Sequence, residues 1–179
     1  MELSKEIIQK CKDCNPQAQK AVYQMLLPYL NSLCKRYLPF SSNRNDALQE
    51  AFINIFTKMD QFDVRKGEFK SWSARIAINT CLRHNKRMTS RKEIELSTTE
   101  YQIPISPDII SRLTNAEILK VLSRMPIEYF QVFNLFVVDG FSHDEIAGML
   151  NIKTSLSRKR LARAREWISR RTELKSMIS

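Results

Sequence analysis

A dense group of cationic side chains near the end of the sequence could bind phosphate groups. Five of the six cations between residues 151 and 167 fall within eight consecutive positions: Arg158, Lys159, Arg160, Arg163 and Arg165. Guanidinium groups form charge-assisted hydrogen bonds to phosphate oxygens, so this composition suits a nucleic-acid partner. Two other interpretations are open at this point, namely a solvated basic helix face and a helix lying on an anionic membrane surface.

A second group with similar chemistry lies in the middle of the chain. Arg75, Asn79, Arg83, Lys86 and Arg87 are separated by four, four, three and one positions, which places most of them along one side of a helix. Cations and an amide on a shared face can contact phosphates and base edges. The sequence therefore offers two separate surfaces for a polyanionic partner.

The residues before the C-terminal cations predict how they are presented. Ser142 and Glu145 have the spacing of a capping box and begin a short helix over residues 142–150. Asn151 tolerates the left-handed conformation of a tight turn, Ile152 can fill the corner, and a second helix is expected from Thr154 or Ser155. A short helix, a tight turn and a basic helix make a helix-turn-helix, whose second helix enters the DNA major groove.

The basic helix also has a side that can face a core. Four residues project within a narrow arc, which the cations leave free: Ser157, Leu161, Ala164 and Ile168. Because the cap, the turn and this inner stripe coincide with the charge, DNA binding is favoured over a solvated face. A membrane-surface helix is disfavoured, since the outward side offers Trp167 but no broad apolar surface.

The overall composition restricts the class of protein. A chain of 179 residues with 43% hydrophobic content suits one or two small globular domains, and a net charge of +10 favours nucleic acid. We expect a cytoplasmic location without membrane insertion, because no apolar run could span a bilayer and MELSKEIIQK lacks a signal-peptide pattern. Cys11 and Cys14 form a C-x-x-C without a second pair, so no metal and no cofactor is predicted.

The pattern along the chain predicts an all-α protein. Only three glycines occur and alternating β-branched runs are missing. Asn15 and Pro16 should begin a helix that Pro28 kinks or interrupts, and residues 60–69 should form a loop. The polar stretch from Thr89 to Arg112 indicates a flexible linker, so we expect two small helical domains, residues 1–90 and 113–179, joined by residues 91–112.

Two stretches resemble one protein family. They are DALQEAFINIFTKMDQFD followed by FKSWSARIAINTCLRHNKR, and LSRMPIEYFQVFNLFVVDGFSHDEIAGMLNIKTSLSRKRLARARE. The chain resembles the bacterial sigma factors of the extracytoplasmic-function group, which keep only the second and fourth conserved regions. The two stretches cover most of the chain outside the predicted linker and occur in the order and at about the distance that the family has.

This resemblance implies a function. The protein would direct core RNA polymerase to specific promoters, with residues 1–90 as region 2 reading and opening the −10 element and residues 113–179 as region 4 reading the −35 element. Its partners would be promoter DNA, the clamp helices of the largest polymerase subunit and the flap of the second-largest subunit. Whether an anti-sigma factor is a further partner is left open. A sigma factor has no active site, so no catalytic residue is expected.

The resemblance also implies site residues for each partner. For the −35 element they are Ser155, Arg158, Lys159, Ala162 and Arg163. For the −10 element they are Phe62, Arg75, Asn79, Arg83, Lys86 and Arg87, whereas Trp72 is interpreted as a core residue because it shares helical spacing with Ile76. For core polymerase they are Asp46, Gln49, Glu50, Phe52 and Asn54.

Three departures from the family pattern concern the basic helix. Ser155-Leu156 replaces the common Gly-Thr, Ser157 stands where an apolar residue is usual, and Lys159 where a small one is. These changes bear on base preference, and one interpretation packs Leu156 at the turn instead of against DNA. Two alternative functions would require other features. A stand-alone dimeric helix-turn-helix regulator would need a dimerisation helix, and a nucleic-acid enzyme would need an acidic cluster or phosphate loop that the motifs do not supply.

Overall fold

The computed structural model describes residues 5–39, 42–95, 122 and 124–170. Within these residues every regular element is a helix and no strand occurs, which confirms the predicted all-α class. The chain divides into two compact units, Met1–Thr99 and Glu100–Ser179. Each unit has its own buried apolar residues and is described separately.

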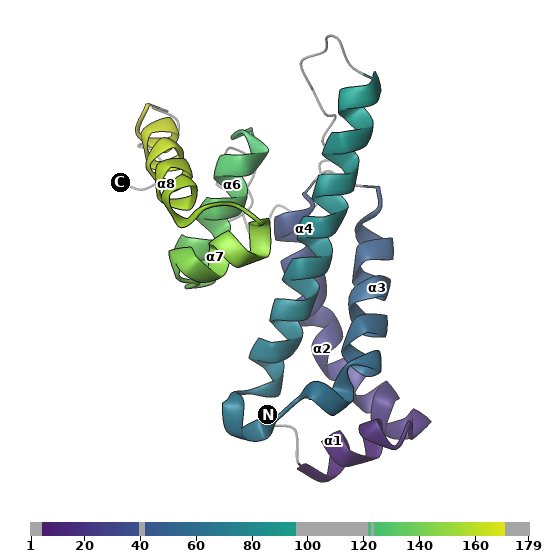
Figure 1. Cartoon of the computed structure of the whole chain (residues 1–179). Helices are drawn as coiled ribbons and strands as arrows, with labels where there is room; N and C mark the ends of the chain where they lie inside the picture. The colour runs from purple at the N-terminus through teal and green to yellow at the C-terminus, as the bar shows by residue number, and fades with distance from the viewer. Residues whose placement is uncertain (1–4, 40–41, 96–121, 123, 171–179) are drawn as a thin grey trace, which may run out of the picture. The chain divides into compact units, whose positions relative to one another are not determined.

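The first unit is built on three long helices (Figure 1). Helix α2 (Pro16–Tyr37), helix α3 (Arg44–Thr57) and helix α4 (Phe69–Glu95) all contact one another. The short helix α1 (Lys5–Lys12) packs against α2 and against the 3-10 turn η1 (Met59–Gln61), and a second turn, η2 (Val64–Lys66), precedes α4. The loop predicted over residues 60–69 therefore consists largely of these two turns.

The core of this unit follows the helical spacing of its apolar residues. Val22 and Leu30 of α2, Ile55 of α3 and Ala77 of α4 are all 0% exposed. Asn15 caps α2 as predicted, since its Oδ1 accepts a hydrogen bond from the backbone nitrogen of Ala18 at 3.0 Å. Three helices that each bury one apolar stripe can stabilise a small unit without a sheet.

Two boundaries differ from the sequence expectation. Pro28 does not interrupt α2, which runs from Pro16 to Tyr37, and the residues two positions before and after it, Leu26 and Leu30, are buried. Packing on both sides offsets the loss of one backbone hydrogen bond at the proline. Helix α4 continues to Glu95, so the first five residues of the predicted linker, 91–95, are helical. The remainder of that linker, residues 96–112, lies outside the described residues.

The second unit contains the predicted helix-turn-helix. Helix α6 (Ile127–Phe133) continues as a π-helical turn, η3 (Asn134–Val138), followed by α7 (His143–Leu150) and α8 (Thr154–Ser169). Gly140, which follows η3 after one intervening residue, has a φ of +74°, a left-handed conformation that glycine adopts readily just past a helix end. Leu122, Met125, Phe130 and Ala164 form a buried cluster, against which Trp167 packs. In the described part of the chain, no helix has the length and hydropathy needed to cross a bilayer.

Candidate functional site

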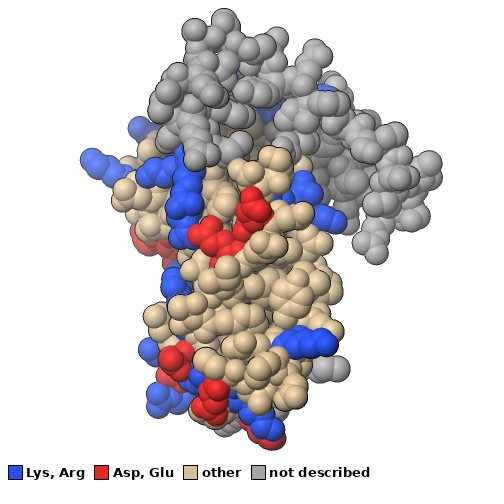
Figure 2. All heavy atoms as spheres, turned by 90° about the vertical axis from the view of Figure 1, so that its right-hand side faces the viewer, with Lys and Arg blue, Asp and Glu red and all other residues tan. Residues whose placement is uncertain are grey.

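The outer side of α3 combines polar and apolar side chains. Asp46 and Gln49 are exposed, Glu50 and Asn54 are partly buried, and Ile53 is 63% exposed. Figure 2 looks onto the side of the first unit on which α3 lies and shows a broad surface free of Lys, Arg, Asp and Glu, with acidic side chains beside it. An uncharged surface that exposes an isoleucine among polar side chains suits a protein-binding site.

The structure differs from the prediction for Phe52. This residue is 4% exposed and packs between Tyr23 and Phe56, with ring centroids 4.5 Å and 6.3 Å away. It therefore belongs to the core and not to the surface predicted to contact polymerase. The neighbouring Ile53, which the sequence prediction missed, takes the exposed position. A helix turns about 100° per residue, so adjacent residues face different surroundings.

Glu50 connects two helices that the sequence assigned to different partners. One carboxylate oxygen lies 2.5 Å from Arg83 Nη2 and the other 2.7 Å from His84 Nε2, both on α4. Partial burial alone would raise the pKa of Glu50, but the hydrogen bond from His84 and the charge of Arg83 outweigh it, so the pKa is lowered. Arg83 thus lies beside the predicted polymerase-binding face as well as on the predicted DNA-binding helix.

The predicted −10 residues on α4 share an exposed surface. Arg75, Asn79, Arg83, Lys86 and Arg87 are all exposed, and their spacing places most of them on one side of the helix. The opposite side, which includes Ala77, Ile78 and Cys81, is buried against the other helices. The structure therefore brings these five residues together on one helix, as the spacing indicated.

Phe62, the remaining residue predicted for the −10 element, is only 6% exposed. Its ring lies 5.1 Å from the ring of Phe69 and 5.4 Å from that of Trp72, so the three aromatic residues form a cluster that holds the loop against the start of α4. Trp72, which the sequence interpretation assigns to the core, is partly buried within this cluster. Phe62 shapes the loop from within, and only a loop movement would expose its ring to a base.

Helix α1 also supports this loop, a contact that no pattern in the sequence predicts. Lys12 Nζ donates a hydrogen bond to the Phe62 carbonyl oxygen at 3.4 Å, and Ile8, Gln9 and Lys12 line one side of a shallow pocket of about 430 Å³. On the other side, hydrogen bonds from the Arg65 side chain and backbone lower the pKa of Asp63 to about 2. The loop is therefore fixed both by α1 and by its own ion pair.

The described cysteines are not grouped with other side chains that could bind a metal ion. Across residues 5–39, 42–95, 122 and 124–170, no three His, Cys, Asp or Glu side chains are grouped to hold a metal ion. Cys11 is buried, which raises the pKa of its thiol, and Cys14 is exposed in a turn with a φ of 56°. The Sγ atoms of the buried Cys34 and Cys81 lie 3.6 Å apart, between α2 and α4.

The helix-turn-helix of the second unit has the predicted caps and turn. Ser142 Oγ accepts from the Glu145 backbone nitrogen at 3.3 Å, and the Ser142 backbone nitrogen donates to Glu145 Oε2 at 3.0 Å. Asn151 adopts the left-handed conformation at φ 54° and ψ 52°, and the nitrogen of Ile152 donates to the Ala147 carbonyl oxygen. The turn therefore reverses the chain directly between α7 and α8.

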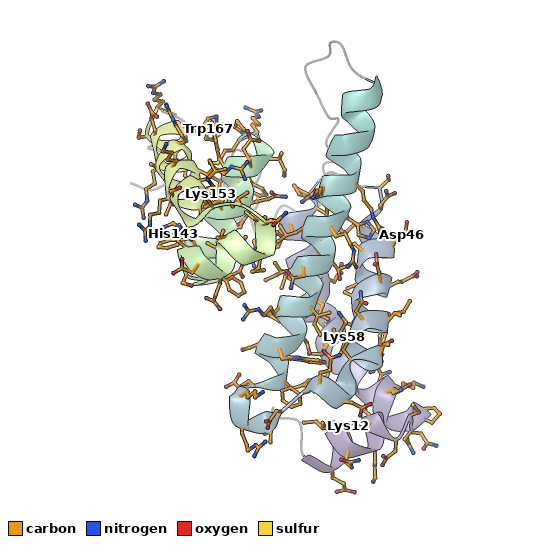
Figure 3. The ribbon with its side chains drawn as sticks, viewed as in Figure 1. Lys12, Asp46, Lys58, His143, Lys153 and Trp167 are labelled. Carbon is orange, nitrogen blue, oxygen red and sulfur yellow. The ribbon has the colours of Figure 1, made fainter. Side chains whose placement is uncertain are left out.

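The buried stripe of α8 fixes which of its residues face outward. Ser157, Leu161 and Ala164 are 0%, 4% and 0% exposed, and the partly buried Ile168 packs against the core cluster. All five residues predicted for the −35 element lie on the exposed side: Ser155, Arg158, Lys159, Ala162 and Arg163. Figure 3 shows nitrogen-tipped side chains along the outer side of α8. This surface is therefore convex and cationic, as a major-groove helix requires.

Two polar contacts between α7 and α8 were not anticipated. His143 Nδ1 lies 2.9 Å from Ser157 Oγ, and the His143 ring stacks on Phe136 with centroids 4.4 Å apart. In addition, Thr154 Oγ1 donates to Asp144 Oδ1 at 2.8 Å. The hydroxyl of Ser157, at a position where an apolar residue was expected, thus has a partner on the other helix.

Comparisons with known proteins match both units. A family model described as Sigma-70 region 2 matches residues 22–91, and one described as Sigma-70, region 4 matches residues 115–168. The chain is 27% identical over 172 residues to the ECF RNA polymerase sigma-E factor of Escherichia coli strain K12, covering 87% of this chain and 88% of that protein. It is also 27% identical over 175 residues to the ECF RNA polymerase sigma factor SigW of Bacillus subtilis, covering 90% and 92%.

Solved structures show the same fold. The sigma factor RpoE in complex with the anti-sigma factor NepR from Bartonella quintana aligns with a TM-score of 0.56 and 22% identity, over 89% of this chain and 97% of that chain. CnrH in complex with the cytosolic domain of CnrY aligns with a TM-score of 0.51 and 19% identity, over 91% and 92%. At these identities the likeness concerns the arrangement of helices.

Proposed function

The chain belongs to the sigma-70 family, in its extracytoplasmic-function group, and from this membership we propose how its residues divide the work of promoter recognition. The protein is a sigma factor that binds core RNA polymerase and promoter DNA and directs transcription initiation. Sigma factors are non-catalytic initiation factors, and we assign no reaction to this chain itself. Because its partners, core polymerase and promoter DNA, lie in the bacterial cytoplasm, we propose a cytoplasmic location.

Helix α8 reads the −35 element from the major groove. Ser155, Arg158, Lys159 and Ala162 lie toward base edges, and Arg163 contacts a phosphate. The supporting observation is the exposure of all five residues opposite the buried stripe of Ser157, Leu161 and Ala164. Because α7 and the turn hold α8 by its buried side, its outer side can enter a groove without rearrangement.

Helix α4 contacts the −10 element. Arg75, Asn79, Arg83, Lys86 and Arg87 provide the surface, and the loop over residues 60–69 holds a base that leaves the stack. Flipping a base costs on the order of a few kcal/mol, which the cationic contacts to the strand help to offset. Phe62 acts by shaping that loop together with Phe69 and Trp72.

The outer face of α3 binds the clamp helices of the largest polymerase subunit. The polar contacts surround Ile53 and come from Asp46, Gln49, Glu50 and Asn54. Ile53 replaces Phe52 as the apolar contact because its side chain is 63% exposed.

The second unit binds the flap of the second-largest subunit. An anti-sigma factor is a further candidate partner, since RpoE of Bartonella quintana was solved in complex with one.

One observation carries the proposal most strongly: a capped helix, a left-handed turn and a basic helix with a buried stripe occur in the same chain as a separate helical unit with a cationic face. A stand-alone regulator would need only the helix-turn-helix and not the separate helical unit. The first unit, which matches Sigma-70 region 2, has no role in such a regulator.

The test is transcription in vitro with core RNA polymerase from the source bacterium, with and without the protein, on sheared genomic DNA. Mapped 5′ ends should reveal new start sites that share a pair of upstream motifs. A matched variant, Arg158→Ala, should weaken initiation at those sites, because Arg158 is exposed on α8 and its removal leaves the fold intact. The absence of new start sites, together with no co-migration with core polymerase, would instead favour a stand-alone regulator.

A further inference from the structure

Leu156 is an apolar side chain on the cationic side of α8. It is the third residue of that helix and is 39% exposed. Lys159 and Arg163, three and seven positions further on, lie on the same strip of the helix and are both exposed. Among the exposed large apolar residues of the described chain, Leu156 is the one that α8 contributes.

Core packing does not account for this placement. The neighbouring Ser157 is 0% exposed and begins the buried stripe, while Leu156 lies about 100° away around the helix. Packing at the turn, one interpretation of the sequence, leaves more than a third of the side chain exposed. The exposed part of Leu156 is therefore available to whatever the first turn of α8 contacts.

We propose that Leu156 is a specificity-determining residue that contacts the 5-methyl group of a thymine in the −35 element. This inference rests on the proposed function, in which α8 lies in the major groove. Residues near the start of a recognition helix reach base edges there. Thymine is the one base that displays a methyl group in the major groove, and an apolar side chain contacts it favourably.

The apolar chemistry of leucine makes this contact selective for thymine. A leucine side chain has no hydrogen-bond donor or acceptor, so it cannot replace the hydrogen bonds that other base edges lose when water leaves. Arg163 on the same strip brings the helix close to the DNA through a phosphate contact that does not depend on sequence. Thymine recognition then comes from Leu156.

The experiment uses holoenzyme reconstituted from the full chain and core RNA polymerase. Once the −35 element is mapped by transcription, each of its thymines is replaced in turn by deoxyuridine, which lacks only the 5-methyl group. We expect one replacement to weaken binding of the wild-type holoenzyme about fourfold, because burial of one methyl-sized group against Leu156 is then lost. Leu156→Ala should bind the thymine and uracil probes equally well.

Arg163→Ala is the matched control on the same strip. It should weaken binding to both probes while keeping the wild-type ratio between them, because a phosphate contact carries no base preference. Leu156→Ala should fold normally, since the side chain is exposed and leucine and alanine have similar helix propensities, and a circular dichroism melt checks this.

Two results would overturn the role of Leu156 while leaving the sigma function intact. One is a wild-type holoenzyme that is indifferent to every uracil replacement, and the other is a mapped −35 element without thymine. A failure of the mapping step itself, with no discrete start sites, would refute the proposed function instead. The two failures are therefore distinguishable.

Discussion

At the scale of single residues, Glu50 is the side chain that connects two functions. It lies on the α3 face assigned to polymerase, yet its carboxylate binds Arg83 and His84 on the helix assigned to the −10 element. The His84 side chain is 12% exposed and that of Glu50 is 34% exposed, so the contact is partly open to water. These contacts therefore join the face proposed to bind polymerase to the helix proposed to contact the −10 element.

Glu50 should also make the first unit sensitive to acid. Its pKa in the folded protein lies below the ordinary value of 4.5, so the carboxylate stabilises the fold fully above about pH 4.5, and this stabilisation is lost as the pH falls through the lowered pKa. We expect the free energy of unfolding to fall more steeply below about pH 4.5 in the wild type than in Glu50→Gln. Urea denaturation followed by Trp72 fluorescence, in a Trp167→Phe background, measures this difference.

The matched control for this prediction is Glu68→Gln, which removes an exposed carboxylate immediately before α4. It should retain the wild-type dependence on pH, because the Glu50 contacts are unchanged. Equal slopes for the wild type and Glu50→Gln would show that the contacts of Glu50 with Arg83 and His84 do not stabilise the fold.

At the scale of helices, the contact between α7 and α8 decides how the basic surface is presented. The capping box fixes the start of α7 and the left-handed Asn151 fixes the turn. The angle of α8 then depends on what packs between the two helices, where His143 bridges Phe136 and Ser157. A polar contact replaces apolar packing here and constrains the two helices through its direction as well as its distance.

Ser157→Ala should therefore weaken the docking of α8. Loss of the hydroxyl leaves His143 Nδ1 without this partner, which should cost about 1 kcal/mol in the free energy of unfolding of the second unit. Denaturation followed by Trp167 fluorescence in a Trp72→Phe background measures this, and binding to the −35 element should weaken in parallel. Ser169→Ala is the control on the same helix, because Ser169 is exposed and its loss should change stability by less than about 0.5 kcal/mol. Equal stability of the two variants would contradict the role given to the His143–Ser157 contact.

At the scale of the whole molecule, the two surfaces proposed to contact DNA belong to separate units, each with its own core. Two linked sites gain affinity when their geometry lets both bind at once, and the gain can then reach about 10² to 10⁴. In a sigma factor, core polymerase is the component that can hold both units at once.

We accordingly expect the free protein to bind a promoter duplex roughly a hundredfold more weakly than the holoenzyme does. Fluorescence anisotropy with a labelled duplex compares the two, and duplexes with either element scrambled serve as controls. For the holoenzyme, scrambling one element should remove most of the gain. Tight, sequence-specific binding by the free protein would mean that its two units are already in register without polymerase.

Local signals in the sequence were sufficient for the helical class and for most of the helix-turn-helix. The Asn15 cap, the capping box at Ser142 and the turn at Asn151 each depend on residues within four positions of one another, so their geometry follows from short-range hydrogen bonds. The predicted −35 surface is exposed for the same reason, because helical spacing defines the side opposite a buried stripe. The end of α4 was misjudged by several residues, since polar residues without a clear breaker do not fix a helix end.

The sequence by itself determined which helices form and which side of each one is apolar. Only the tertiary structure decided that Phe52 is covered while Ile53 is exposed, that Glu50 binds Arg83 and His84, and that Ser157 finds His143. Periodicity describes a helix relative to its own axis, whereas these outcomes depend on where other helices place their atoms. Contacts between residues 14 to 34 positions apart are set by packing, and packing is a property of the assembled unit.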